Sequence, residues 1–256
     1  MPFTLCHPAI VIPLHRYARG FTSLPALAIG SMMPDFVYFF SFGISGEFSH
    51  STPGILLYCV PVGALVYIVY QMLLRQALLA WLPRTVSARM GPPSLPVRNA
   101  RAAWTILLSL AIGAATHVFW DAFTHPDTIP VAYFALLRER VSLGGHDLPV
   151  FKVLQHGSSL LGLIVMVTCT LTWVSRTEAR SPYPPTLSNP QRWLAVAAVL
   201  AAAAAGGVFA LLTADPAKPQ RVPFDVITTS MAAGAVAVVL LCIGWTTFAD
   251  KALDHG

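Results

Sequence analysis

Five long runs of apolar residues constrain this chain more than any other feature of its sequence. Each run is long enough to cross the roughly 30 Å hydrocarbon core of a bilayer as a helix rising about 1.5 Å per residue. Because the runs are continuous and do not alternate with polar residues, they predict helices rather than the strands of a membrane barrel. The runs cover residues 53–74, 103–123, 158–175, 193–212 and 225–248.

The sequence therefore predicts an all-α fold, a polytopic transmembrane helix bundle with five long spanning helices. Two shorter apolar pieces, residues 8–14 and 24–40, precede them and predict an N-terminal helical hairpin. Only 11% of the residues are charged, against about 25% in a soluble domain, which excludes a soluble globular protein. We expect one membrane domain over residues 1–256, with the motif-bearing helices in 1–165 and the remainder of the bundle in 166–256.

Basic residues between the apolar runs predict the orientation of the helices. The segment 75–101 contains five arginines and no acidic residue, so the positive-inside rule assigns it to the cytoplasm. The same alternation places residues 15–19, 176–192 and 249–256 inside. The net charge of +5 is explained by this topology, and no nucleic-acid partner is expected. We predict a multi-pass protein of the inner (plasma) membrane with the lipid bilayer as its main partner.

Titratable residues gather on the opposite, extracytoplasmic side of this topology. Such groups are costly in a bilayer and commonly mark function. Six of them fall at the outer ends of the apolar runs, although they are far apart in the sequence. They are Asp35, His50, His117, Asp121, His125 and His156. If residues 7–19 descend from the outer face and 22–35 return to it, His7 joins them.

The spacing of these residues favours metal binding. His117, Asp121 and His125 follow one another at intervals of four, so a helix presents them along one stripe. Pro126 disfavours helical geometry at His125, which then hangs from the helix end. A pair of the type H-x3-D offers one nitrogen and one oxygen ligand, a combination that suits zinc or a similar divalent ion. The predicted ligands of one or two such ions are His7, Asp35, His50, His117 and Asp121.

Each of these residues also has an explanation without a metal. A histidine in an apolar helix is often a hydrogen-bonded core group, and Arg138 or a helix terminus would stabilise Asp121. Cys6, beside His7, is expected to be a small buried side chain rather than a ligand. The four cysteines are far apart in the sequence, and no disulfide framework is expected.

Two further segments carry structural predictions. The pairs Ala202/Gly206 and Ala203/Gly207 in the run 193–212 let helices approach closely, which favours packing inside the bundle over a homo-oligomer contact. Residues 129–141 predict a short interfacial helix, a simple surface element rather than a lid.

Five sequence blocks resemble a "domain of unknown function" family of bacterial membrane proteins that opens with MPFT-x-x-HP. The blocks are MPFTLCHPAIVIPLHR, IGSMMPDF, FSHSTPG, GAATHVFWDAFTH and KVLQHGSSLLGL, which together cover roughly residues 1–165. That family is in turn similar to membrane-bound proteins described as metal-dependent hydrolases, which distantly resemble zinc-dependent phospholipase C. The recurring pattern of the broader set is an N-terminal His, a PD pair, an HS pair and H-x3-D.

The resemblance implies metal-ligand roles for the residues that match each motif. These are His7 for the N-terminal His, Asp35 for the PD pair, His50 for the HS pair, and His117 with Asp121 for H-x3-D. The chain has PDF where the broader pattern has PDxDH. This difference removes one potential ligand near Asp35 and argues against a multi-metal site.

The leading functional hypothesis is an integral-membrane, metal-dependent hydrolase that acts on a lipid headgroup or another phosphoester at the outer interface. No GxSxG motif is present, so water is the expected attacking group. Whichever of Asp35 and Asp121 is not a ligand would act as general base, and His125 or His156 would protonate the leaving group.

Two alternatives come from other classes of protein. The same polar residues could form the relay of a transporter or ion-handling protein, although the other spanning runs have almost no titratable residue near their centres. They could also hold a structural metal in a non-catalytic membrane scaffold. Metal-dependent flux without ester turnover would favour the first alternative, and collapse of a His117→Ala variant would favour the second.

Overall fold

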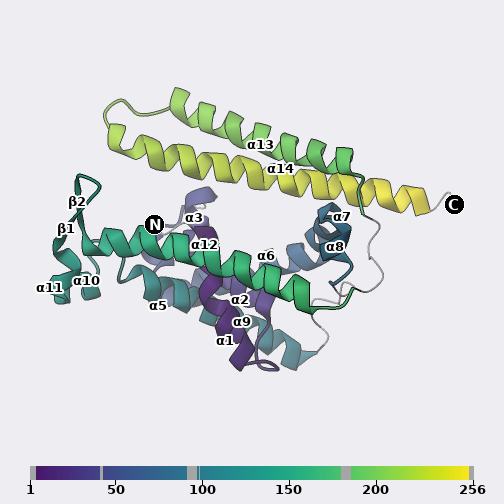
Figure 1. Ribbon diagram of the computed structural model, residues 1–256, viewed down its shortest axis with the longest axis horizontal. Coiled ribbons are helices and arrows are strands. Elements are labelled where there is room, and N and C mark those ends of the chain that lie inside the picture. The colour runs from purple at the N-terminus through teal and green to yellow at the C-terminus, as the bar shows by residue number, and fades with distance from the viewer. Residues whose placement is uncertain (1–3, 41–42, 91–96, 98, 180–185, 254–256) are drawn as a thin grey trace. The chain divides into compact units, whose positions relative to one another are not determined.

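The computed structural model describes residues 4–40, 43–90, 97, 99–179 and 186–253 (Figure 1). In this part of the chain, five helices are long and apolar enough to cross a membrane, which confirms the predicted helical membrane fold. They are Thr52–Trp81, Ala100–Asp121, Val150–Arg176, Asn189–Leu212 and Pro219–Thr247. The first three residues of the MPFT motif and His255 lie outside the described residues.

Contacts between residues divide the chain into two compact units, which are described separately below. The first unit comprises Met1–Val37, Phe42–Tyr67 and Val97–Trp173, and the second comprises Tyr38–Ser41, Ile68–Pro96 and Val174–Gly256. All six titratable residues predicted at the outer helix ends, and His7, belong to the first unit. A single domain over the whole chain stays a prediction.

The first unit begins with the predicted helical hairpin. A single 3-10 turn, η1 (Thr4–Cys6), leads into α1 (Pro8–Tyr17), and α2 (Leu24–Gly30) returns alongside it. The second arm is not one continuous helix, because the 3-10 turn η2 (Met33–Asp35) separates α2 from the short α3 (Phe36–Phe39). Proline at the second position of η2 starts this turn and places Asp35 at its end.

Two glycines bring the hairpin into backbone contact with α9 (Ala100–Asp121), whose first turn is capped by the side chain of Asn99. A methyl group added at Gly30 would overlap the backbone of Leu110, and one added at Gly113 would overlap the backbone oxygen of Leu27. Only glycine permits this approach between two helices. His117 lies one turn beyond Gly113 on α9. The close approach of the two backbones at Gly113 therefore places His117 near Asp35.

The next segment makes a sharp turn and then forms the first of the long apolar helices. Ser45 caps α4 (Gly46–Ser49) and Ser51 caps α5 (Thr52–Gly54), so His50 is held between two capped helix starts. The chain continues without a break through a π-helical turn, α6 and a second π-helical turn to its end in α7. These elements are η3 (Ile55–Cys59), α6 (Val60–Val69), η4 (Tyr70–Leu74) and α7 (Arg75–Trp81).

The predicted interfacial helix over residues 129–141 is wrong in its extent. The segment forms two short helices, α10 (Ile129–Tyr133) and α11 (Ala135–Arg138), and then the hairpin β1 (Arg140–Leu143) and β2 (His146–Pro149). Extended backbone at Phe134 interrupts the helix, and Gly144 and Gly145 turn the hairpin with positive φ angles of 59° and 82°. The long helix α12 (Val150–Arg176) follows directly.

The main elements of the second unit are α8 (Arg84–Ser87), the end of the first spanning helix, and a pair of long helices. These are α13 (Asn189–Leu212) and, after η5 (Pro219–Arg221), α14 (Val222–Leu253). Gly206 packs against Ala233 and Thr229 of α14, and Gly207 packs against Ser230. The small residues of α13 therefore serve packing within the chain, the use that the sequence favoured.

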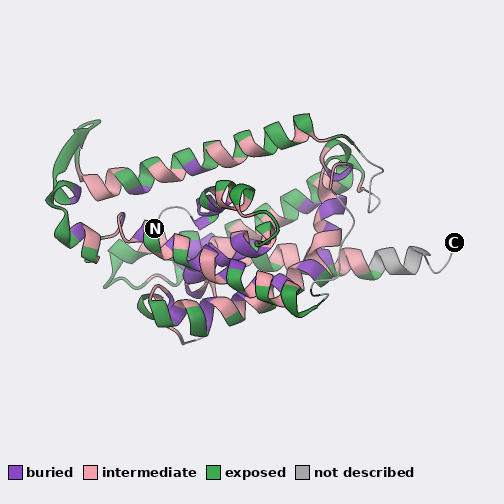
Figure 2. Ribbon diagram, turned by 90° about the horizontal axis from the view of Figure 1, so that it is seen from below, coloured by how far each residue is buried: buried purple, intermediate pink, exposed green. Residues whose placement is uncertain are grey.

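Buried and exposed residues are distributed differently over the helices that carry the polar groups and over the long apolar helices (Figure 2). The buried residues of the first unit concentrate in α2, η2 and α9, where the polar groups also lie. In contrast, large apolar side chains on α12 and α13 are exposed, among them Leu160, Leu171, Trp193 and Leu200. Hydrocarbon is the environment that exposed apolar helix faces of this kind require.

Candidate metal centre

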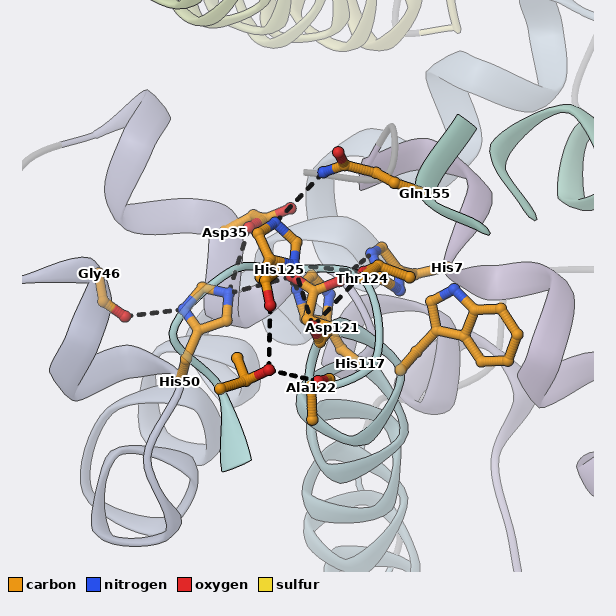
Figure 3. A network of polar contacts seen from close by, with 12 residues as sticks. His7, Asp35, Gly46, His50, His117, Asp121, Ala122, Thr124, His125 and Gln155 are labelled. Atoms are coloured by element: carbon orange, nitrogen blue, oxygen red, sulfur yellow. Dashed lines mark hydrogen bonds and ion pairs between the residues drawn. The ribbon is translucent and has the colours of Figure 1, made fainter. Parts of the chain in front are cut away.

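Two aspartates and two histidines face one point in the first unit (Figure 3). Asp35 comes from η2, His50 from the end of α4, and His117 and Asp121 from successive turns of α9. Each offers one donor atom, and these four atoms all lie within 4.8 Å of one another. The structure thus brings together residues from three separate segments, as the sequence predicted.

The distances between these donors fit a shared ion better than hydrogen bonds. Asp35 Oδ1 lies 3.4 Å from His50 Nε2 and 3.6 Å from His117 Nε2. Asp121 Oδ2 lies 3.7 Å and 3.4 Å from the same two nitrogens. Hydrogen bonds of this type are about 2.7–3.2 Å long. Two donors that bind one tetrahedral ion at about 2.1 Å lie roughly 3.4 Å apart.

Several buried atoms of the centre have no hydrogen-bond partner among the described residues. They are His7 Nε2, Asp35 Oδ1, His117 Nε2 and Asp121 Oδ1. Leaving one such atom unsatisfied costs about 1–3 kcal/mol, and more when the group is charged. A cation at the centre would satisfy Asp35 Oδ1 and His117 Nε2 together. The residues present therefore fit a divalent ion.

The ring orientations leave both histidines ready to bind metal through the same nitrogen. His117 Nδ1 donates to the backbone oxygen of Ser31 at 2.7 Å, and His50 Nδ1 donates to that of Gly46 at 2.8 Å. When Nδ1 carries the proton, Nε2 keeps its lone pair for a ligand. In both rings Nε2 is the atom that faces the two carboxylates.

Two hydroxyl groups hold the hairpin side of the centre in place. Ser49 Oγ donates to the backbone oxygen of Pro34 at 2.7 Å, which ties α4 to η2 and sets His50 beside Asp35. Thr4 Oγ1 donates to Asp35 Oδ2 at 2.6 Å, leaving Oδ1 to face the histidines. Burial opposes the charge of Asp35, but the attraction of His117 and His50 and the bond from Thr4 hold its pKa below the usual range.

His7 contacts the centre from its other side. Its ring stacks on His117 at a centroid distance of 3.7 Å, and its Nε2 lies 3.6 Å from Asp121 Oδ1. Burial, reinforced by His117, lowers the pKa of His7 to about 3, so the ring is neutral. His7 is thus placed near the ligands, as the hairpin predicted, but its nearest carboxylate oxygen is not the one that faces His50.

The outer rim of the centre contains His125 but not His156. His125 lies beyond the end of α9, where its Nδ1 donates to the backbone oxygen of Asp121 at 3.0 Å. Its Nε2 lies 3.4 Å from the amide nitrogen of Gln155, and Lys152 bonds the oxygen of the same amide at 2.7 Å. Burial lowers the pKa of His125.

The structure does not bring His156 to the cluster. One residue along a helix rotates a side chain by about 100°. Gln155 is therefore buried against His125, whereas His156 is exposed on α12. A catalytic role for His156 has no contact in the described chain to support it.

A comparison with protein families gives a match that covers nearly the whole sequence. The family model is described as "Domain of unknown function (DUF4184)", and it matches residues 1–244. The chain belongs to the DUF4184 family. No curated protein and no solved structure gives a significant match.

Sequence reasoning missed supporting contacts of this DUF4184 chain, three of which concern residues outside the predicted site. They involve Thr4, Ser31 and Gln155, which bond the predicted ligands or His125. A signal existed for two of them, because Thr4 belongs to the MPFT block and Gln155 to the KVLQHG block. Ser31 acts through its backbone oxygen, so its residue type carried no information.

We predict that Thr4→Val weakens metal binding without unfolding the protein. The change removes the hydroxyl that orients Asp35 while keeping the volume of the side chain. Loss of such a supporting bond commonly lowers metal affinity about 10–100-fold. Competition with a chromophoric chelator would measure it.

Thr22→Val is the matched control, because Thr22 bonds Ala18 and His15 away from the centre. We expect its metal affinity to equal that of the wild type. Equal affinities for all three proteins would show that Thr4 does not support the ligand set.

Proposed function

We propose that this protein is a membrane-embedded, metal-dependent hydrolase of phosphoesters, with one divalent ion at Asp35, His50, His117 and Asp121. The observation that carries this proposal is the convergence of four donor atoms from three segments, two of which, Asp35 Oδ1 and His117 Nε2, are buried without a hydrogen-bond partner. Mixed nitrogen and carboxylate donors suit zinc, our first candidate for the ion. A second ion, if one binds, would have His7 Nε2 and Asp121 Oδ1 as ligands.

One side of the centre is partly exposed, which supports the hydrolase over a structural site. The side chain of His117 is completely buried, whereas those of His50 and His125 are 21% and 26% exposed. Water and a phosphoester can therefore approach past these two rings. In the proposed hydrolase the ion would bind water or substrate on this side in addition to its four protein donors, an expanded shell that zinc can adopt.

When bound, a divalent ion polarises a phosphoryl oxygen and lowers the pKa of a coordinated water towards neutrality. In our proposal Asp35 and Asp121 supply the negative charge that holds the ion, and the carbonyl groups of Ser31 and Gly46 keep the histidines aligned. His125 is the proton carrier on the open side. It accepts the proton of the attacking water as the new P–O bond forms, and returns it to the ester oxygen as the old P–O bond breaks.

The membrane position supports an amphiphilic substrate. Asp121 ends a spanning helix and α12 begins close to His125 in the contacts described, so the centre lies at one end of the spanning helices of its unit. The loop charges favour the extracytoplasmic end. We therefore propose action on a phosphoester at the outer interface of the plasma membrane.

A structural metal remains the second candidate function, and one observation favours it. Four protein donors already complete a tetrahedral shell, as they do in structural zinc sites. Under this alternative the ion would hold the hairpin against α9 and no ester would be turned over.

Substitution of His125 tests the hydrolase. We expect His125→Ala to lower kcat by about 100-fold while the metal content stays unchanged, because the ring moves a proton but does not hold the ion. The measurement is phosphate-ester turnover by the full chain in mixed micelles of a phospholipid, with zinc or manganese added.

His156→Ala is the control and should keep wild-type turnover, because this side chain is exposed and away from the centre. The absence of turnover in the metal-loaded wild type, over a range of phosphate mono- and diesters, would favour the structural alternative. Equal kcat values for the two variants would remove His125 from the mechanism.

A further inference from the structure

An apolar groove lies beside the metal centre within the first unit. Its volume is about 260 Å³, close to the lower end of the range for small-molecule sites. We call it the α1–α12 groove, because most of its lining comes from these two helices. The lining includes His7, Ile10, Pro13, Trp120, Ser158 and Val165.

The wall of the groove presents carbon almost throughout. Its polar side chains are few and lie towards one end, where Trp120 Nε1 donates to Ser158 Oγ at 3.1 Å. Ser158 Oγ in turn donates to the backbone oxygen of Gln155, so this pair is satisfied within the protein. Beyond it, Ile10, Pro13 and Val165 offer no donor or acceptor side chain. A ligand that fits this wall is a hydrocarbon.

The polar end of the groove reaches the metal centre through His7. This ring lines the groove, stacks on His117 and faces Asp121 Oδ1 at 3.6 Å. Trp120, the residue before Asp121, also lines the groove. A molecule in the groove therefore has one end next to the proposed reaction site.

The groove extends from that end along the apolar part of the helices. Towards Pro13 in α1 and Val165 in α12, it leaves the polar end and follows residues of the spanning segment Val150–Arg176. Gly162 keeps the two walls together, because a methyl group there would lie only 3.0 Å from Cys6 Cβ. The groove thus runs from its polar end beside the centre along the apolar part of the two helices.

We propose that the α1–α12 groove binds the hydrocarbon chain of a phospholipid substrate, whose phosphoester then lies at the metal centre. This proposal rests on the proposed function, and it assigns the substrate class to membrane lipids rather than soluble phosphoesters. Recognition comes from burial of methylene groups, so it selects for chain length and not for a particular headgroup.

Photo-crosslinking tests the groove without any need for turnover. The probe is a phosphatidic acid with a diazirine at mid-chain, in nanodiscs of phosphatidylglycerol and phosphatidylcholine that contain the full chain. We expect saturable labelling of the peptide that carries residues 158–165, and competition by unlabelled phosphatidic acid. Labelling that does not saturate and that spreads evenly over the exposed helices would show bulk lipid contact only, and would overturn the proposal.

Two valine substitutions on α12 provide a matched pair. Val165 lines the groove, whereas Val167 is 57% exposed and does not line it. We expect Val165→Trp to fill the groove and reduce saturable labelling about tenfold, while Val167→Trp leaves it unchanged. Equal labelling of the two variants would contradict the proposal.

Turnover separates this proposal from the proposed function. With an active enzyme, Val165→Trp should raise KM about tenfold for a long-chain phosphatidic acid and leave that for a soluble short-chain ester unchanged. If both variants hydrolyse both substrates equally, the groove is not the chain site, although the hydrolase stands. If saturable labelling occurs and no ester is turned over, the groove stands and the hydrolase fails.

Discussion

His117→Ala is expected to remove the bound ion and to abolish turnover. His117 is completely buried and faces both carboxylates. A water that replaced its ring in the alanine variant would need a hydrogen-bond partner inside the cavity that the substitution leaves. Metal content should fall from about one ion per chain to below about 0.1, and kcat by about 1,000-fold or more. Elemental analysis of purified protein and phospholipid turnover would measure the two effects.

His146→Ala serves as the control for this variant, because His146 is exposed in β2. It should retain the ion and full activity. A His117→Ala protein that binds metal as tightly as the wild type would refute the proposed ligand set. Retained fold with lost turnover would favour catalysis, and a collapsed protein would favour a structural metal.

Removal of the ion is expected to lower Tm by roughly 10 °C. Without it, the facing oxygen of Asp35 and nitrogen of His117 are buried without partners. A ligand present at 1,000 times its Kd stabilises the folded state by about 4 kcal/mol, and each kcal/mol shifts Tm by about 2–4 °C in a chain of this size. Thermal unfolding in detergent with and without a chelator would measure the change.

The His117→Ala protein provides the internal control for chelation, since it should lack the ion from the start. Chelator should then leave its Tm unchanged, and added zinc should restore the Tm of the wild type only. If chelator changes the Tm of both proteins equally, the stabilising ion lies outside the Asp35–His50–His117–Asp121 centre.

Composition and helical spacing were sufficient to predict the spans and the main members of the centre. The apolar runs correspond to the spanning helices because a bilayer leaves few other solutions for the backbone. Likewise, His117 and Asp121 were predictable as neighbours, since residues four apart share a helix face. The charges of the loops predicted Asp35 and His50 at the same end of the helices as His117 and Asp121, and the structure places all four together.

Local turns and the direction of single side chains were harder to predict. His156 and Gln155 are adjacent in the sequence, and the choice between them depends on the rotation of α12, which no periodicity near residue 155 reveals. The β1–β2 hairpin was missed because its strands are only four residues long, although the Gly144–Gly145 pair is a recognised hairpin signal.

The close approach of Gly30 and Gly113 has a consequence for biogenesis. At seven residues, α2 is too short to cross a bilayer by itself, and the hairpin carries the charge of Asp35. The hairpin gains these backbone contacts, and Asp35 gains His117 as a second histidine neighbour after His50, only once α9 has been synthesised. We therefore expect chains arrested before residue 113 to stay with the insertion machinery or to be degraded by membrane proteases.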